Sequence, residues 1–164
     1  DLQVLLARWS AAIAQLMAAR AKSVTCLDRS ERVMAAARQR FGPERSVRNV
    51  RFVVGDLHAL AFGDAQFDHV LLFNVLTYAH APARAIAEAT RVLRPRGDLV
   101  VVTLEAHQQE DVTAAYQHVN SGFTVPALKK MLQKAGLTVE SCAVSSREKR
   151  EPHFQVITAV AHKS

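Results

Sequence analysis

Short apolar runs alternate with helix-like segments along most of the chain, and this alternation restricts the fold more than any other feature. The runs at residues 23–28, 67–74 and 99–104 are almost continuously apolar, as is typical of parallel strands that are covered on both faces. Strand-like and helix-like segments take turns from residue 12 to residue 136. This order predicts an α/β fold with a doubly wound, mostly parallel sheet and helices on both of its faces.

The predicted helices carry sequence signals of helix ends. Ser30 is placed to cap a helix over residues 31–41, and Thr124 is placed to cap a later one. Pro82 suits the first turn of the helix between them. Gly136 follows the last helical residue, where a left-handed C-terminal cap favours glycine.

Two β-rich runs, 137–144 and 154–161, close the chain. The charged connection between them, SSREKREPH, is short enough for an antiparallel hairpin. With the strand at residues 49–54, the sequence predicts seven strands, or six if the first strand is missing. The last strand is predicted to lie antiparallel between its neighbours.

Length and composition indicate one globular domain over residues 1–164. The 164 residues are 49% hydrophobic and show no low-complexity run. The net charge of +6 is compatible with anionic partners, but the basic residues are dispersed in segments such as RSERVMAAARQR and SREKR. Solvated helix faces and turns explain this dispersion better than a nucleic-acid surface does.

Neither a membrane nor an oxidising compartment is expected. No apolar stretch approaches the roughly 20 residues that cross a bilayer, and no signal peptide is recognised at the start of the chain. Cys26 and Cys142 sit in apolar runs and form no disulfide framework or metal-ligand spacing. These features predict a cytoplasmic protein with two free thiols.

Two acidic residues end successive predicted strands. Asp28 is placed to accept hydrogen bonds from a ribose diol, although the same residue type also caps a following helix. Asp56 follows Gly55, which would let the backbone approach a ligand, although a turn aspartate would look the same. Ligands of such sheets bind outside the carboxyl ends of the strands, where these two acids are expected to meet.

The segments around these acids resemble the class I S-adenosylmethionine-dependent methyltransferases. CLDRSERVMAAARQR resembles the family's second motif, and VVGDLHALAFGDAQFDHVLLFNVLTYAHAP resembles the next two. RVLRPRGDLVVV is similar to the family's usual entry into the following strand. The resemblance covers residues 12–104.

This resemblance implies S-adenosylmethionine as the cofactor and gives each matching residue a role. Asp28 would hold the ribose hydroxyls, Asp56 the adenine amino group, Leu57 would border the adenine, and Asn74 would lie near the methionine end. The implied cofactor-binding residues are Asp28, Arg29, Gly55, Asp56, Leu57 and Asn74. Methyl transfer needs little beyond in-line placement of a nucleophile, so no catalytic residue is named. A small-molecule acceptor is expected.

The C-terminal third is similar to methyltransferase domains fused behind winged-helix regulators of the ArsR type. The similar segments are HQQEDVTAAYQHVNSGFTVPALKKMLQKAGLTVE and SREKREPHFQVITAVAHK. This similarity implies a DNA-binding domain upstream of Asp1 as a partner, or a homodimer.

The first eleven residues depart from the family pattern, which has a turn of the type Asp-x-Gly-x-Gly-x-Gly. Counting back from Asp28, the acid falls on Leu5, and the glycine positions include Trp9. In one interpretation Leu2–Leu6 is the central strand of a degenerate, non-catalytic sensing or dimerisation domain of a transcriptional regulator. In the other, Leu2–Trp9 is a linker helix and a segment is missing near Ser10; the helical spacing of the apolar residues favours this second interpretation.

Histidine and tyrosine residues supply candidates for the substrate end of the site. His80 is placed to orient or deprotonate a substrate, and Tyr78 to line the same pocket. His107, Glu110 and His118 fit no strong metal-ligand spacing, so no metal site is expected. A nicotinamide-dependent oxidoreductase could also use Asp28, but the terminal hairpin and the GDLHAL turn favour the methyltransferase.

Overall fold

The computed structural model describes residues 2–7, 11–41, 48–115 and 117–164. The strands are β1 (Gln3–Ala7), β2 (Ser23–Asp28), β3 (Val50–Val54), β4 (Phe67–Phe73), β5 (Leu93–Leu104), β6 (Leu137–Arg147) and β7 (Gln155–Lys163). The helices are α1 (Ala11–Ala18), α2 (Glu31–Arg40), the 3₁₀ helix η1 (Leu76–Tyr78), α3 (Pro82–Val92), α4 (Glu110–Ala115) and α5 (Val125–Lys134).

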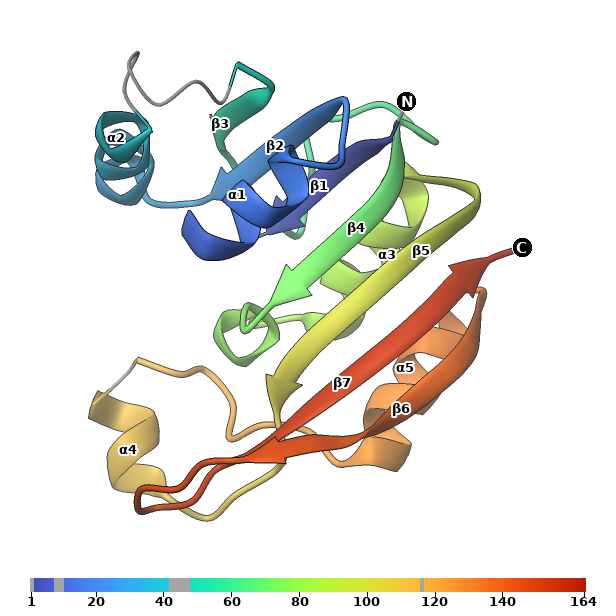
Figure 1. Ribbon diagram of the computed structural model, residues 1–164. Helices are drawn as coiled ribbons and strands as arrows, with labels where there is room; N and C mark the ends of the chain where they lie inside the picture. The colour runs from blue at the N-terminus through green and yellow to red at the C-terminus, as the bar shows by residue number, and fades with distance from the viewer. Residues whose placement is uncertain (1, 8–10, 42–47, 116) are drawn as a thin grey trace.

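The strands form one seven-stranded sheet in the order β3-β2-β1-β4-β5-β7-β6 (Figure 1). β1 to β5 pair in parallel, and β7 runs antiparallel between β5 and β6. The predicted α/β fold, the seven strands and the antiparallel C-terminal hairpin are therefore confirmed. The carboxyl ends of the parallel strands lie at one edge of the sheet, which is where a ligand site is expected.

The first strand corrects one prediction. The favoured linker helix over Leu2–Trp9 is wrong, because β1 pairs in parallel with both β2 and β4, and Leu5 faces Thr25 on one side and Val70 on the other. A run this short and apolar fits a helix turn or a strand buried on both faces equally well by spacing alone. The position between β2 and β4 requires a strand, because the backbone amides and carbonyls of these two strands would otherwise be buried without hydrogen-bond partners. The predicted break near Ser10 lies outside the described residues.

Most predicted element ends are confirmed. The Ser30 hydroxyl accepts a hydrogen bond from the Val33 amide at 3.3 Å, and the Thr124 hydroxyl accepts one from the Ala127 amide at 3.3 Å. β5 begins at Leu93 rather than at the predicted residue 99, since Leu93 already pairs with Phe67 of β4 before the register shifts.

Helices cover the two faces of the sheet unequally. The main core lies between the sheet and the helices α3 and α5, and a second cluster lies beneath α1 over β1 to β3 and extends to Leu71 and Phe73 of β4. In Figure 1, α1 lies in front of β1 and β2, whereas no described helix lies in front of β5 and β7. The surface left uncovered, here called the open face, includes the half-buried Val100, Val102, Leu104, Val156 and Val160. Leu71 and Phe73 of β4 lie on the same side and pack against the second cluster.

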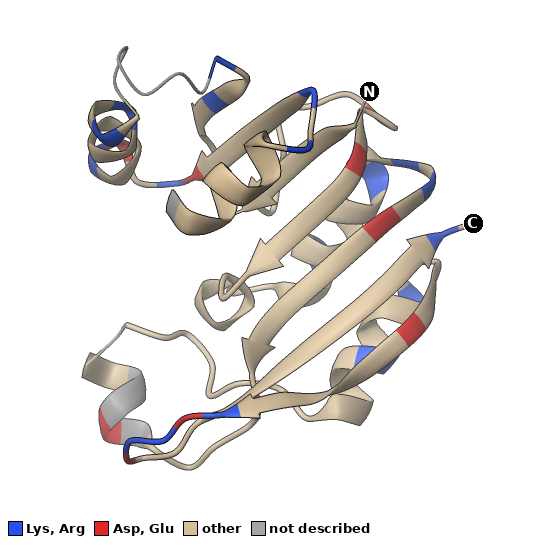
Figure 2. Ribbon diagram, in the orientation of Figure 1, with Lys and Arg blue, Asp and Glu red and all other residues tan. Residues whose placement is uncertain are grey.

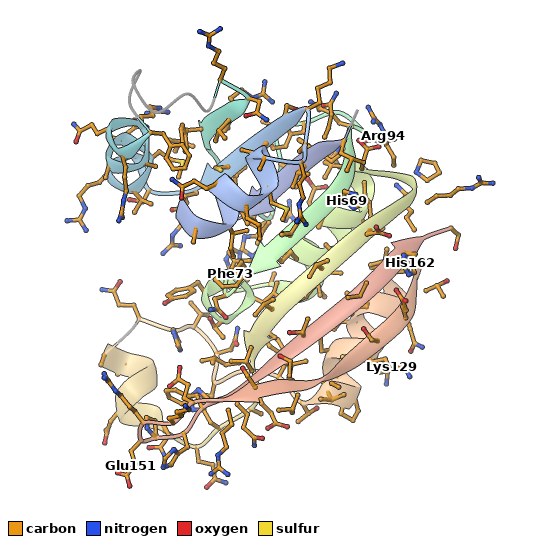
Figure 3. All side chains as sticks on the ribbon, in the orientation of Figure 1. His69, Phe73, Arg94, Lys129, Glu151 and His162 are labelled. Carbon is orange, nitrogen blue, oxygen red and sulfur yellow. The ribbon has the colours of Figure 1, made fainter. Side chains whose placement is uncertain are left out.

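A row of ionisable side chains crosses the open face at the edge where β4 begins. Asp98 of β5 lies 3.1 Å from the Nδ1 atom of His69 and 2.6 Å from the Nδ1 atom of His162. The Nε2 atom of His162 lies 2.7 Å from Glu140 of β6, and Figure 3 shows both histidines on this side of the sheet. Hydrogen bonds to Asp98 and then to Glu140 raise the pKa of His162.

Most Lys and Arg residues lie around the sheet rather than along its central strands. Figure 2 shows them on α2, in the turn at the start of β5 and on the β6–β7 connection, whereas β4, β5 and β6 each carry a short acidic stretch. No helix in the described part of the chain is both long enough and apolar enough to cross a membrane.

Candidate functional site

A cavity of about 490 Å³ lies at the carboxyl ends of β2 and β3. Its volume is within the range of pockets that enclose a small organic ligand or cofactor. The lining residues are Leu27, Asp28, Arg29, Ser30, Val33, Gly55, Asp56, Leu57, His58, Val75, Tyr78, Ala79, His80 and Gln117. The cavity therefore combines two carboxylates and two imidazoles with an apolar lining.

The two acids of the cavity are held by the same local turn. The Oδ1 atom of Asp28 accepts the Ser30 amide at 2.9 Å, and the Oδ1 atom of Asp56 accepts the His58 amide at 2.8 Å. In each case the acceptor bonds the backbone two residues ahead, which fixes the chain where it leaves the strand. No hydrogen bond from a described residue reaches the Oδ2 atom of either acid, so these oxygens can serve a ligand.

His58 and His80 form a stacked pair beside Asp56. Their ring centroids lie 3.9 Å apart with an interplanar angle of 33°. His58 is only 8% exposed, and its Nδ1 atom lies 2.8 Å from the Oδ1 atom of Asp56. The His58 amide and then its ring hold the pKa of Asp56 below its usual value. Asp56 is therefore an anion that can accept but not donate hydrogen bonds at neutral pH.

The chain after Asp56 is clamped by Arg91 of α3. Its guanidinium contacts both carboxylate oxygens of Glu88, at 2.8 and 2.9 Å, and Asp64 at 2.7 Å. It also donates to the carbonyl oxygens of Leu60 and Phe62, both at 2.9 Å. Hydrogen bonds from Arg91 lower the pKa of Glu88. The Oε2 atom of Glu88 also accepts a hydrogen bond from the Leu60 amide. The loop that leaves the cavity is thus tied to α3.

The opposite wall of the cavity comes from η1 and from the segment after α4. The amides of Val119 and Asn120 donate to the carbonyl oxygen of Thr77 at 2.8 and 3.2 Å. The Asn120 side chain donates to the carbonyl oxygen of Leu76 at 2.9 Å. These bonds place Gln117 beside the residues of η1 that line the cavity.

The comparisons with known proteins point to one family. The family model described as "Methyltransferase domain" matches residues 9–101, which is more than half of the chain. The chain belongs to the class I S-adenosylmethionine-dependent methyltransferases. S-adenosylmethionine is accordingly the cofactor that the family implies for the cavity.

Curated methyltransferases are similar to this family member over part of their length. The ubiquinone/menaquinone biosynthesis C-methyltransferase UbiE of Dinoroseobacter shibae is 34% identical over 107 residues, which cover 65% of this chain and 42% of that protein. The chain spans less than half the length of this and two other curated relatives that it matches.

Solved structures show the methyltransferase fold over nearly the whole chain. An S-adenosylmethionine-dependent methyltransferase from Mesorhizobium loti superposes with a TM-score of 0.80 at 18% identity, covering 99% of this chain and 91% of that chain. The [4+2]-cyclase SpnF superposes with a TM-score of 0.82 at 20% identity, covering 99% of this chain and 74% of that chain. At these identities the likeness concerns the fold alone.

Most of the predicted site residues come together at this cavity. The cavity is lined by seven of them: Asp28, Arg29, Gly55, Asp56, Leu57, Tyr78 and His80. Asn74 does not line it; this residue follows β4 with a φ of 49°, and its amide donates to the carbonyl oxygen of Val102. The described residues include no group of three or more His, Cys, Asp and Glu side chains that could hold a metal ion.

The sequence analysis missed several residues that line the cavity. Ser30 and Val33 were assigned only to the helix after β2, and Gln117 comes from a segment with no regular pattern. His58 could have been found from the sequence. It follows Asp56 by two residues, and an aspartate side chain commonly accepts a hydrogen bond from the backbone two residues ahead.

The lining chemistry fits the adenosine part of S-adenosylmethionine. Two anionic oxygens at adjacent strand ends suit a ribose diol and an exocyclic amino group, which donate hydrogen bonds. Leu57 and Val33 offer apolar surface for a flat ring. The positions that the family uses for its glycine turn lie largely at residues 8–10, outside the described part of the chain.

Proposed function

We propose that this protein transfers the methyl group of S-adenosylmethionine to a small-molecule acceptor. The observation that carries the proposal is the cavity at the strand ends, where Asp28 and Asp56 each keep one carboxylate oxygen without a described donor. The cofactor would supply an electrophilic methyl group on its sulfonium. The protein would contribute binding and orientation, which account for most of the rate in such transfers.

Individual residues have distinct proposed roles. Asp28 would accept the ribose hydroxyls, and Asp56 would accept the adenine amino group. Arg29, Gly55 and Leu57 would border the nucleoside, as all three line the cavity. Asn74 stays a proposed neighbour of the methionine end, supported by the resemblance and not by the cavity lining.

Tyr78 and His80 are the proposed contacts to the methyl acceptor. Both line the cavity, and His80 is exposed, so that an acceptor could reach its ring. An imidazole there could take up the proton that an oxygen or nitrogen acceptor releases on methylation.

Calorimetric titration with S-adenosylhomocysteine, the demethylated product, tests the proposal. Asp28→Ala should weaken binding by about 1.5–3 kcal/mol, the scale of a hydrogen bond to a charged group. Asp111→Ala is the matched control, since this residue is exposed on α4 and lies outside the cavity lining. No binding by the unchanged protein, or equal affinities for Asp28→Ala and wild type, would contradict the proposal.

A non-catalytic sensing or dimerisation domain is the second candidate. The observation that favours it is the absence of glycine from residues 1–41, where the family pattern has its glycine turn. This candidate predicts that S-adenosylhomocysteine binds while methyl-labelled S-adenosylmethionine gives no labelled product with small oxygen, nitrogen or sulfur nucleophiles. Transfer of label to any of them would support catalysis instead.

The proposal also covers the partner of the domain, the location of the protein and the state of its cysteines. The similarity of the C-terminal third supports an ArsR-type regulator with an upstream DNA-binding domain or a homodimeric form. Cys26 and Cys142 are free thiols, which supports a reducing, cytoplasmic location. Burial raises the pKa of Cys26 to about 12, so this thiol stays protonated and inert.

A further inference from the structure

His58 uses all of its polar atoms within the wall of the cavity. Its Nδ1 atom lies 2.8 Å from the Oδ1 atom of Asp56, and its Nε2 atom accepts the Ala81 amide at 3.3 Å. Its carbonyl oxygen accepts the Nε atom of Arg84 at 2.9 Å, and its own amide donates to Asp56. Bonds to α3 and its N-cap and to the strand-end turn therefore fix the ring.

The partners of the ring determine its protonation. A backbone amide can only donate, so the Nε2 atom that faces Ala81 must carry a lone pair. The remaining proton then sits on Nδ1 and is donated to the carboxylate of Asp56. This arrangement makes His58 a neutral donor in one defined tautomer.

The Asp56 carboxylate is consequently divided into two oxygens with different tasks. Oδ1 accepts both the amide and the ring of His58, each at 2.8 Å. No described residue donates to Oδ2. Two donors on one oxygen hold the carboxylate plane in place, so Oδ2 presents a fixed acceptor to whatever occupies the cavity.

We infer that His58 is a positioning residue that makes the cavity selective for 6-aminopurine nucleosides over 6-oxopurine nucleosides. A fixed anionic acceptor attracts an exocyclic amino group and repels a carbonyl oxygen at the same position. This inference rests on the proposed function, because it requires the nucleoside of the cofactor to face Asp56. It adds a positioning residue, His58, to the adenine contact that the family resemblance implies for Asp56.

The stacked His80 strengthens this role. Its ring lies against the ring of His58 at 3.9 Å between centroids, so His58 cannot rotate away from Asp56 without displacing it. A histidine that only filled the core would not have to direct its Nδ1 atom at the cavity-lining carboxylate of Asp56. Loss of the Nδ1 donor would leave Asp56 held by one amide and free to turn about its side-chain bond.

Calorimetry with S-adenosylhomocysteine and S-inosylhomocysteine measures the selectivity directly. The wild-type protein should prefer the amino compound by about 100-fold or more, the discrimination expected where an unmatched polar group is left in a site. His58→Leu should lower this preference about tenfold, the effect of losing one hydrogen bond to a charged group. His58→Asn should retain most of it, since its amide nitrogen can take the place of Nδ1.

His69→Leu is the matched control. This histidine also directs its Nδ1 atom at an aspartate, at 3.1 Å, but it lies on the open face away from the cavity. Its removal should leave the preference unchanged even if the protein becomes less stable. Circular dichroism on each variant shows that the affinities belong to folded protein.

Two outcomes would overturn the inference, and they are distinguishable. If the wild-type protein binds neither compound, the proposed function fails and the inference fails with it. If the wild-type protein prefers the amino compound and His58→Leu keeps the full preference, only the role of His58 fails. Long-range ¹H–¹⁵N correlation spectra give an independent test, because the inference requires the Nδ1-protonated neutral pattern for His58, and an Nε2-protonated ring would contradict it.

Discussion

At the scale of single residues, the sequence located the two acids but not the way in which they are held. Asp28 and Asp56 were predictable because each follows a clear strand. Their shared turn, with Oδ1 bound to the amide two residues ahead, depends on backbone geometry that composition does not reveal. At Asp28 the two interpretations of the sequence are compatible, because Oδ1 stabilises the turn while no described residue donates to Oδ2 and the residue lines the cavity.

Two glycines with similar backbone angles should respond differently to substitution. Gly122 has a φ of 89°, and a Cβ atom there would collide with the backbone carbonyl of Glu105. Gly136 has a φ of 84° and no atom within 4 Å of that position. We expect Gly136→Ala to lower the free energy of unfolding by about 1–2 kcal/mol, from the left-handed backbone alone. Gly122→Ala should cost about 2 kcal/mol more, from overpacking, and urea denaturation of both variants measures the difference.

Arg91 should contribute both to stability and to the cavity. Arg91→Met removes the bonds to Glu88 and to two carbonyl oxygens of the loop after Asp56, and we expect a loss of about 2–3 kcal/mol in urea denaturation. Arg91→Lys should recover only part of this loss, because an ammonium cannot reproduce the planar fork of donors. Full recovery by lysine would show that charge alone accounts for the effect.

At the scale of elements, the periodicity of apolar residues predicted the strands and helices reliably, except in segments too short to show a period. The strands and the capped helices from residue 23 onward were predictable, since each combines an apolar pattern with an end signal. β1 was not, because a five-residue apolar run has too few positions to distinguish two periods. Its identity follows from tertiary pairing on both sides.

The ionisable row on β5, β6 and β7 should make stability depend on pH in a defined direction. The pKa of His162 is raised in the folded protein by Asp98 and Glu140. Its stabilising contribution is therefore complete below the ordinary histidine pKa, about 6.5, and is lost as the pH rises through the higher folded-state pKa. We expect His162→Gln to reduce the free energy of unfolding more at pH 6 than at pH 9.

Urea denaturation at the two pH values measures this difference. His153→Gln is a suitable control, because the ring of His153 lies beside the carbonyl oxygen of Glu148 rather than beside a carboxylate. Equal effects of His162→Gln at both pH values would contradict the assigned cause of the raised pKa.

At the scale of the whole molecule, α3 and α5 cover one face of the sheet over its central and C-terminal strands, whereas helix cover on the other face lies over β1 to β3. The sequence predicted helices on both faces but not their unequal coverage, since residues 99–104 of β5 look equally apolar on both sides. Its alternation is visible only in the folded chain, where Val101 is fully buried and Val100 and Val102 remain half-buried. Figure 3 shows Phe73 on the same open side.

Adjacent valines of β5 should therefore differ in their contribution to stability. Val101→Ala should cost about 2 kcal/mol in urea denaturation, from lost burial and a residual cavity. Val102→Ala, on the open face, should cost less than about 1 kcal/mol. Equal losses would indicate that the open face is covered in solution.

The direction of β7 has a practical consequence for handling the protein. β1 starts at Gln3 and β7 ends at Lys163, and because the two strands run in opposite directions within their sheet, both positions lie away from the edge that bears the cavity. A tether attached near either position would anchor the molecule with its cavity facing outward. Surface-immobilised protein should accordingly capture nucleoside ligands from flow as well as free protein does, and either attachment point should serve.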